Sequence, residues 1–157
     1  MSFEKAKEYL ESRGYGDRII ATEHSSATVE AAAQARGCEM GEIAKSLSFI
    51  TPDGPVMILA EGTARVDNHK YKAAFSCKAK MIPFDMVEEL TGHEPGGVCP
   101  FGCNENVKVY LDESLRKYEV VYPAAGNDHR GVRLTVGELE QAAASLGWVD
   151  VCKDAAR

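Results

Sequence analysis

The sequence lacks the features of a membrane protein and of a disulfide-bonded secreted protein. No apolar run approaches the roughly 18–20 residues that a membrane-spanning helix needs. The first residues carry charge throughout, with no apolar segment ahead of a cleavage site, which predicts no signal peptide. The five cysteines show no C-x-x-C spacing, which indicates free thiols in a reducing compartment. We therefore expect a cytoplasmic protein without a disulfide framework.

The chain also lacks an excess of positive charge. Its 18 lysines and arginines are outnumbered by 24 aspartates and glutamates, which gives a formal net charge of −6. This balance excludes a protein that coats nucleic acid by bulk electrostatics, although a local cluster can still hold one. Residues 69–80 contain four lysines and no acid. Such a run is typical of a solvated surface, and it is also compatible with a local nucleic-acid contact.

The length of 157 residues favours a single domain over residues 1–157. Periodicity and capping signals predict helices at 2–14, 29–37, 85–92 and 135–147, with Thr28 as the cap of the second helix and capping boxes at Asp85 and Thr135. Strand-like runs lie at 18–23, 44–50, 56–61, 107–111, 118–123 and 131–135. Asp53-Gly54 predicts a tight hairpin turn between the second and third runs. Together these elements predict an α+β fold with a mixed or largely antiparallel sheet.

Lys45 is the most informative residue of the predicted strands. Because side chains alternate across a strand, Lys45 shares a face with the bulky Ile43, Leu47 and Phe49. An ammonium group in that row is costly unless it reaches water, a carboxylate or an anionic ligand. Two interpretations remain open: the side chain reaches solvent at the strand end, or it lines a cleft for a polar or phosphate-bearing ligand.

The stretch TGHEPGGVCPFGC, residues 91–103, contains four glycines, two prolines, a histidine and two cysteines. A metal site would use His93, Cys99 and Cys103, but the C-x3-C spacing and the lack of a second ligand pair argue against zinc. We expect no metal and no other cofactor. Gly96-Gly97 lets the backbone approach a ligand, and amides held between two prolines can bind an oxyanion. A plain long turn is the alternative interpretation.

A thiol nucleophile is a further hypothesis. Cys99 could pair with His93, or with His129 in the late loop. Sequence spacing does not bring these side chains together, so the hypothesis stays open at this point.

Three segments together resemble one protein family. EIAKSLSFI, EPGGVCPFG and AAGNDHRGVRLTVGELEQ are similar, in that order, to the YbaK/ProX family of aminoacyl-tRNA deacylases, relatives of the editing domain inserted in bacterial prolyl-tRNA synthetases. The resemblance covers nearly the whole chain. It implies a curved sheet or partial barrel with flanking helices, and hydrolysis of the ester that joins a wrong small amino acid, such as Ala, Cys or Ser, to a tRNA of the tRNA-Pro type. The implied partner is the acceptor end of that tRNA, and a synthetase is a second candidate.

The resemblance also implies roles for individual residues. The residues implied to be catalytic are Lys45, Gly96 and Gly97, and in family members the loop amides and the terminal ribose hydroxyl are held to do much of the chemistry. The residues implied to bind substrate are Thr28, Ser46, Val98, Cys99, Pro100, Gly102, Gly126 and His129. Ala125 stands where relatives often have serine before the glycine, which favours a small apolar aminoacyl group. A non-catalytic module that binds an amino acid or aminoacyl-tRNA in the same cleft is the alternative function.

Overall fold

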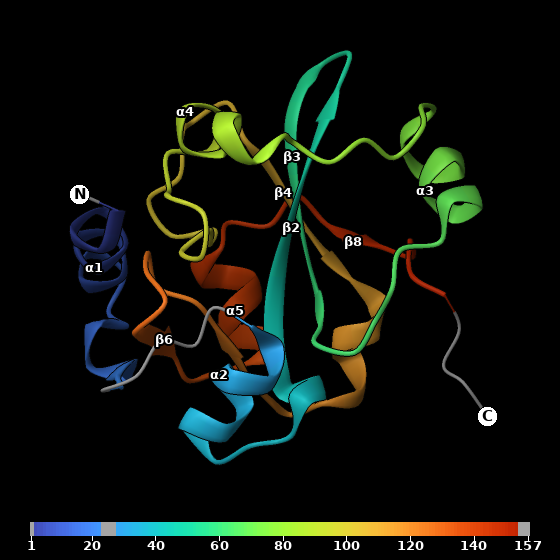
Figure 1. Ribbon diagram of the computed structural model, residues 1–157. Coiled ribbons are helices and arrows are strands. Elements are labelled where there is room, and N and C mark those ends of the chain that lie inside the picture. Colours follow the sequence, from blue (N-terminus) through green and yellow to red (C-terminus); the bar gives the residue numbers. More distant parts are fainter. Residues whose placement is uncertain (1, 23–27, 154–157) are drawn as a thin grey trace.

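The computed structural model describes residues 2–22 and 28–153 (Figure 1). The helices are α1 (Ser2–Ser12), α2 (Val29–Arg36), α3 (Asn68–Phe75), α4 (Val87–Thr91) and α5 (Val136–Ala142). The strands are β1 (Ile19–Ala21), β2 (Ile43–Thr51), β3 (Gly54–Glu61), β4 (Lys108–Asp112), β5 (Val120–Pro123), β6 (Arg130–Val132), β7 (Leu134–Thr135) and β8 (Trp148–Val149). None of the helices in these ranges is long and apolar enough to cross a membrane.

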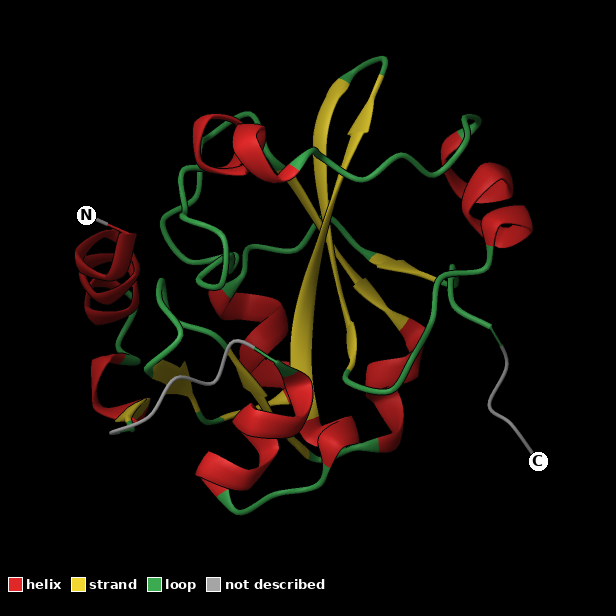
Figure 2. Cartoon of the chain, in the orientation of Figure 1, coloured by secondary structure: helices red, strands yellow, loops and turns green. Residues whose placement is uncertain are grey.

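The sheet is mixed and curls into a half-barrel with helices around it (Figure 2). Its six strands run in the order β7-β5-β2-β3-β4-β8, and β1 pairs with β6 in a separate two-stranded sheet. The β2–β3 and β5–β7 pairs are antiparallel, whereas β2–β5, β3–β4 and β4–β8 are parallel. This architecture confirms the predicted α+β fold class.

The β2–β3 hairpin is the longest paired unit of the sheet. Its register runs from Ala44 opposite Glu61 to Thr51 opposite Gly54, which confirms the predicted tight turn. Gly54 has a φ of 114°, a left-handed value that glycine adopts at no steric cost. Val56 to Glu61 are all buried, so both faces of β3 are covered.

Two apolar clusters cover these two faces. The main core contains Met57 and Leu59 of β3, Leu10 of α1 and Leu139 of α5. The opposite face of β3 meets α3, where Tyr71 is fully buried and its ring centroid lies 4.9 Å from that of Phe49. Figure 1 shows α1 and α3 on opposite sides of the molecule, as this division requires.

The structure corrects several predicted elements. Residues 69–80 are mostly exposed, in agreement with the predicted solvated surface, but the helix α3 that begins before them and ends at Phe75 was not predicted. Asp67 caps this helix by accepting from the His69 and Lys70 amides, and Tyr71 is its buried residue. The capping box at Asp85 is wrong, since residues 84–86 form a single 3-10 turn and α4 begins at Val87 without a side-chain cap. The helix predicted at 135–147 ends at Ala142, and strand β8 was not predicted.

The predicted cap of α5 leads to a stability test. Thr135 Oγ1 accepts from the Glu138 amide at 3.1 Å, and the Glu138 carboxylate accepts from the Thr135 amide at 2.9 Å. Thr135→Ala removes one of these bonds and should lower the free energy of unfolding by about 1 kcal/mol. Chemical denaturation followed by circular dichroism measures this change. Thr135→Ser keeps the acceptor oxygen and should stay close to wild type; equal losses in both variants would contradict the capping role.

Candidate functional site

A pocket lies where β2 extends beyond its short pairing with β5. That pairing involves only Ile43 and Ala44, so the next part of β2 is an open sheet edge. The cavity measures about 230 Å³ and is enclosed by the first turns of α2, this edge of β2, the glycine-rich loop and the loop after β5. Much of its wall is apolar, with Val29, Ala32, Val98 and Ala124 among the lining residues.

The polar groups of the pocket are unusual for this acidic protein. They are Thr28, Arg36, Lys45, Ser46, Asn127 and Arg130. Three of them are cationic, and no acidic residue lines the pocket among the described parts of the chain. A chain of net charge −6 thus presents a locally positive cavity. Such a cavity attracts an anionic group.

Lys45 is half-buried, and its position fits the interpretation of a lysine that lines a cleft. It lines the pocket, and its ammonium Nζ donates a hydrogen bond to the backbone carbonyl of Ala64 in the turn after β3. Burial lowers the pKa of Lys45 from its ordinary value, Arg65 acts in the same direction, and Cys152 and Glu61 oppose the shift. The side chain therefore ends at a fixed backbone acceptor, Ala64, which lines a second cavity rather than this pocket.

The glycine-rich loop meets the pocket through Gly96 and Val98. Gly97 does not line it: its amide donates to the Glu94 carbonyl at 2.9 Å within a turn. A Cβ at position 97 would lie 2.2 Å from the Gly126 carbonyl oxygen, so Gly97 serves a close approach of two loops. In the described chain, the Gly96 and Val98 amides donate to no protein acceptor. In the glycine-rich loop, the residues that line the pocket are therefore Gly96 and Val98, and Gly97 is not among them.

Ser46 and Thr28 contribute hydroxyl groups in different ways. Thr28 Oγ1 accepts from the Ala31 amide at 3.0 Å and so begins α2, which confirms the predicted cap. The hydroxyl oxygen of Ser46 is buried and has no hydrogen-bond partner among the described residues. A buried unpaired hydroxyl is costly, and a ligand group in the pocket can satisfy it.

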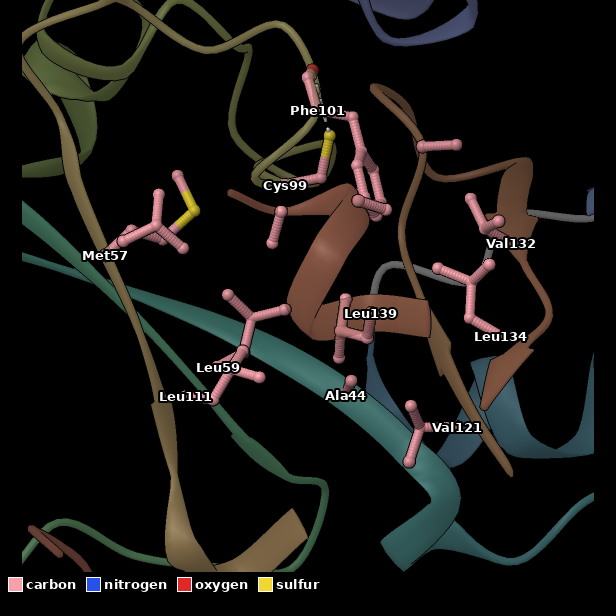
Figure 3. Packing of buried hydrophobic residues seen from close by; sticks show 14 of the residues in the cluster. Ala44, Met57, Leu59, Cys99, Phe101, Leu111, Val121, Val132, Leu134 and Leu139 are labelled. Atoms are coloured by element: carbon pink, nitrogen blue, oxygen red, sulfur yellow. Dashed lines mark hydrogen bonds between the residues drawn. The ribbon is translucent and has the colours of Figure 1, made fainter. Parts of the chain in front are cut away.

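Cys99 lies in the main core and not in the pocket (Figure 3). Its side chain is fully buried, and burial raises the pKa of its thiol to about 12. His93 lies beside it, with Nε2 3.5 Å from Cys99 Sγ, but both ring nitrogens have other partners. Nε2 donates to the Phe101 carbonyl at 2.7 Å, so Nδ1 accepts from the Ser2 hydroxyl at 2.7 Å. The pair is adjacent, yet it is packed as structure and is poorly suited to nucleophilic attack.

The remaining predicted substrate-binding residues lie outside the pocket lining: Pro100, Gly102, Gly126 and His129. Cβ atoms at Gly102 and Gly126 would each lie 2.6 Å from backbone atoms of α1, and both glycines have positive φ. The Pro100 carbonyl accepts from the Cys103 thiol at 3.7 Å. His129 lies outside the pocket lining, with Nε2 3.3 Å from Asp128 Oδ1. Across residues 2–22 and 28–153, no three His, Cys, Asp or Glu side chains are grouped to hold a metal ion.

Sequence reasoning missed several pocket residues. Val29, Ala32 and Arg36 lie on one face of α2, and Tyr122 lies in β5. The helical spacing of 29, 32 and 36 behind the Thr28 cap was the available signal for the α2 residues. Nothing local distinguishes Tyr122 from an ordinary strand residue.

Comparison with known proteins places this chain in a family. Residues 23–142 match the model of the aminoacyl-tRNA editing domain. The chain belongs to the aminoacyl-tRNA editing domain family. The uncharacterized protein YwhH of Bacillus subtilis is 42% identical over 155 residues, which cover 98% of this chain and 99% of YwhH. This result confirms the family predicted from the three motifs.

More distant relatives of this editing domain support the same family assignment. A solved structure described as that of a candidate trans-editing enzyme for prolyl tRNA synthetase is 33% identical, with a TM-score of 0.88 over 98% of both chains. A proline–tRNA ligase of Limosilactobacillus fermentum is 30% identical over 95 residues, which are 57% of this chain and 17% of the ligase. The match thus covers a small part of that ligase.

The close approach of the two loops leads to a second stability test. Gly97→Ala places a methyl group against the Gly126 backbone and should lower the free energy of unfolding by about 1–3 kcal/mol. Gly137→Ala is the matched control, because no atom lies within 4 Å of its added Cβ and its position is inside α5. The control should stabilise the protein by about 0.5–1 kcal/mol. Wild-type stability of Gly97→Ala in chemical denaturation would contradict the described packing.

Proposed function

We propose that this editing-domain protein is a trans-editing hydrolase acting in the cytoplasm. Its substrate is a tRNA of the tRNA-Pro type carrying a wrong small amino acid, such as Ala, Cys or Ser. The observation that carries the proposal is the cation-lined pocket with apolar walls, whose lining includes Lys45, Gly96 and Val98. This combination suits a ligand with an anionic backbone and a small side chain, which is the chemistry of an aminoacylated tRNA end.

The reaction is hydrolysis of an ester. Water adds to the carbonyl carbon, the carbonyl oxygen becomes an oxyanion, and the bond from carbon to the ribose oxygen then breaks. The products are the free amino acid and the ribose hydroxyl of the tRNA. Amides pointing at the oxyanion stabilise it, and the Gly96 and Val98 amides have no acceptor among residues 2–22 and 28–153, so we assign them this role. We assign Lys45, Arg36 and Arg130 to the anionic groups of the tRNA terminus.

The apolar walls address amino-acid selection. A pocket that merely binds distinguishes one methylene by only about 1–3 kcal/mol, so a separate hydrolytic site that admits small side chains is an effective second filter. The cavity of about 230 Å³ and its valine and alanine walls suit a small side chain. Two proline–tRNA ligases match this sequence. We therefore propose a prolyl-tRNA synthetase as the second partner.

Deacylation of mischarged tRNA tests the proposal. Wild type should release Ala, Cys or Ser from at least one mischarged tRNA-Pro, and Lys45→Ala should lower kcat by about 100-fold or more, the loss expected for a removed electrostatic stabiliser. Lys72→Ala is the matched control, since Lys72 is an exposed lysine of α3 outside the pocket lining. Binding of the mischarged tRNA without any release would favour the non-catalytic module instead. Full activity of Lys45→Ala would show that the catalytic assignment is wrong.

Cys99 separates this mechanism from a thiol-dependent one. Because the thiol is fully buried with a pKa of about 12, we expect Cys99→Ala to keep at least about a third of the wild-type kcat. The native protein should also resist alkylation at Cys99, which mass spectrometry of iodoacetamide-treated protein measures. Loss of turnover in Cys99→Ala at wild-type stability would support a nucleophilic thiol.

A further inference from the structure

The turn between β3 and α3, residues 61–64, holds the acceptor of Lys45. The Ala64 carbonyl accepts from Lys45 Nζ, while the Ala64 amide donates to the Glu61 carbonyl at 3.0 Å. Glu61 ends β3 and lies opposite Ala44, one residue before Lys45 in β2. The conformation of this short turn therefore decides where the ammonium group of Lys45 is held.

The buried carboxylate of Glu61 forms hydrogen bonds within the turn and to Tyr118. The Glu61 side chain belongs to a residue that is only 1% exposed, and its Oε1 accepts from the Thr63 hydroxyl. Its Oε2 accepts from the Tyr118 hydroxyl at 3.5 Å, and its amide donates to Ser114 Oγ at 3.2 Å. Burying a carboxylate is costly, so hydrogen bonds of this kind are needed to keep it in place. The Thr63 bond joins two residues of the turn itself.

The same turn also contacts a wall of the pocket. A Cβ at Gly62 would lie 1.9 Å from the Met40 carbonyl oxygen and 2.7 Å from Val29 Cγ1. Val29 begins α2 and lines the pocket, so the turn packs directly against the helix that faces Lys45. A shift of the turn would therefore disturb the acceptor of Lys45 and the α2 wall together.

We propose that Glu61 and Thr63 are positioning residues of the hydrolase, which fix the Ala64 carbonyl and through it hold the Lys45 ammonium beside the pocket. The inference rests on the proposed function. Neither residue lines the pocket described above. Both line a second cavity, to which Ala64, Arg65 and Cys152 also belong. They act only through the backbone acceptor and through the charge of the carboxylate.

The charge of Glu61 gives this role an electrostatic signature. Lys45 is faced by Glu61 at the end of β3, by Arg65 just after the turn and by Cys152 near the described C-terminal end. Glu61 favours the charged ammonium, whereas burial and Arg65 disfavour it. Removing the negative charge in Glu61→Gln should therefore lower the pKa of Lys45 further from its ordinary value.

The test compares Thr63→Val with Thr63→Ser and Glu61→Gln with Tyr118→Phe. Thr63 is exposed, so its replacement should leave the fold intact. Thr63→Val should lower kcat about tenfold on the mischarged tRNA that wild type cleaves best, with KM within about twofold, because a misplaced catalytic group slows the chemical step. Thr63→Ser keeps the hydroxyl and should restore the wild-type kcat. Glu61→Gln should lower kcat similarly, whereas Tyr118→Phe, which loses only the long contact, should not.

A second readout does not depend on turnover. The side-chain NMR signals of Lys45 in labelled protein, assigned by Lys45→Arg, report its pKa and its order. Glu61→Gln should lower that pKa, and Thr63→Val should broaden or shift the signals while Thr63→Ser leaves them unchanged. If wild type cleaves no mischarged tRNA, the hydrolase proposal is wrong, and these signals still decide the positioning role. Unchanged Lys45 signals in both Glu61→Gln and Thr63→Val, or equal kcat in Thr63→Val and Thr63→Ser, would overturn the inference.

Discussion

The register of the β2–β3 hairpin is the constraint on which the site depends. Side chains alternate across a strand, so Lys45 opposite Ala60 points to one face while Ala44 opposite Glu61 points to the other. Sliding the pairing by one residue would turn every side chain of β2 over. Because Met57 and Leu59 fill the main core and Ile58 and Ala60 fill the second cluster, burial on both faces of β3 forbids such a slip. The core thereby places the ammonium beside the pocket.

Glycines serve this protein chiefly by allowing backbones to touch. Gly97 admits the Gly126 carbonyl, Gly126 admits α1, and Gly62 admits the Met40 carbonyl. The first contact joins two loops at the pocket, the second packs one of these loops on α1, and the third packs the turn after β3 against residue 40. The glycine-rich segments at the pocket are therefore held in place by backbone contacts. Electrostatic stabilisation of a transition state requires such a fixed backbone.

The site also shows how an acidic protein can present a locally positive cavity. The net charge of −6 opposes non-specific adhesion to nucleic acid, whereas Arg36, Lys45 and Arg130 gather from separate parts of the chain around one cavity. Recognition of this kind is confined to the group that enters the pocket, here proposed to be the aminoacylated end of a tRNA. YwhH matches this chain over nearly its whole length, so the same proposal of a tRNA-end ligand can be tested on that protein.

The sequence by itself determined what depends on neighbouring residues. The Thr28 cap, the Thr135–Glu138 capping box, the Asp53-Gly54 turn and the odd position of Lys45 could all be identified from local patterns, and three motifs sufficed for the family. Only the tertiary structure decided which groups face the pocket. It engaged the Gly97 amide with Glu94, buried Cys99 in the core and brought Arg36 beside Arg130. It also formed the helix α3, whose Tyr71 packs on Phe49. Capping and turn chemistry act over a few residues, whereas burial and partner choice depend on segments that only folding brings together.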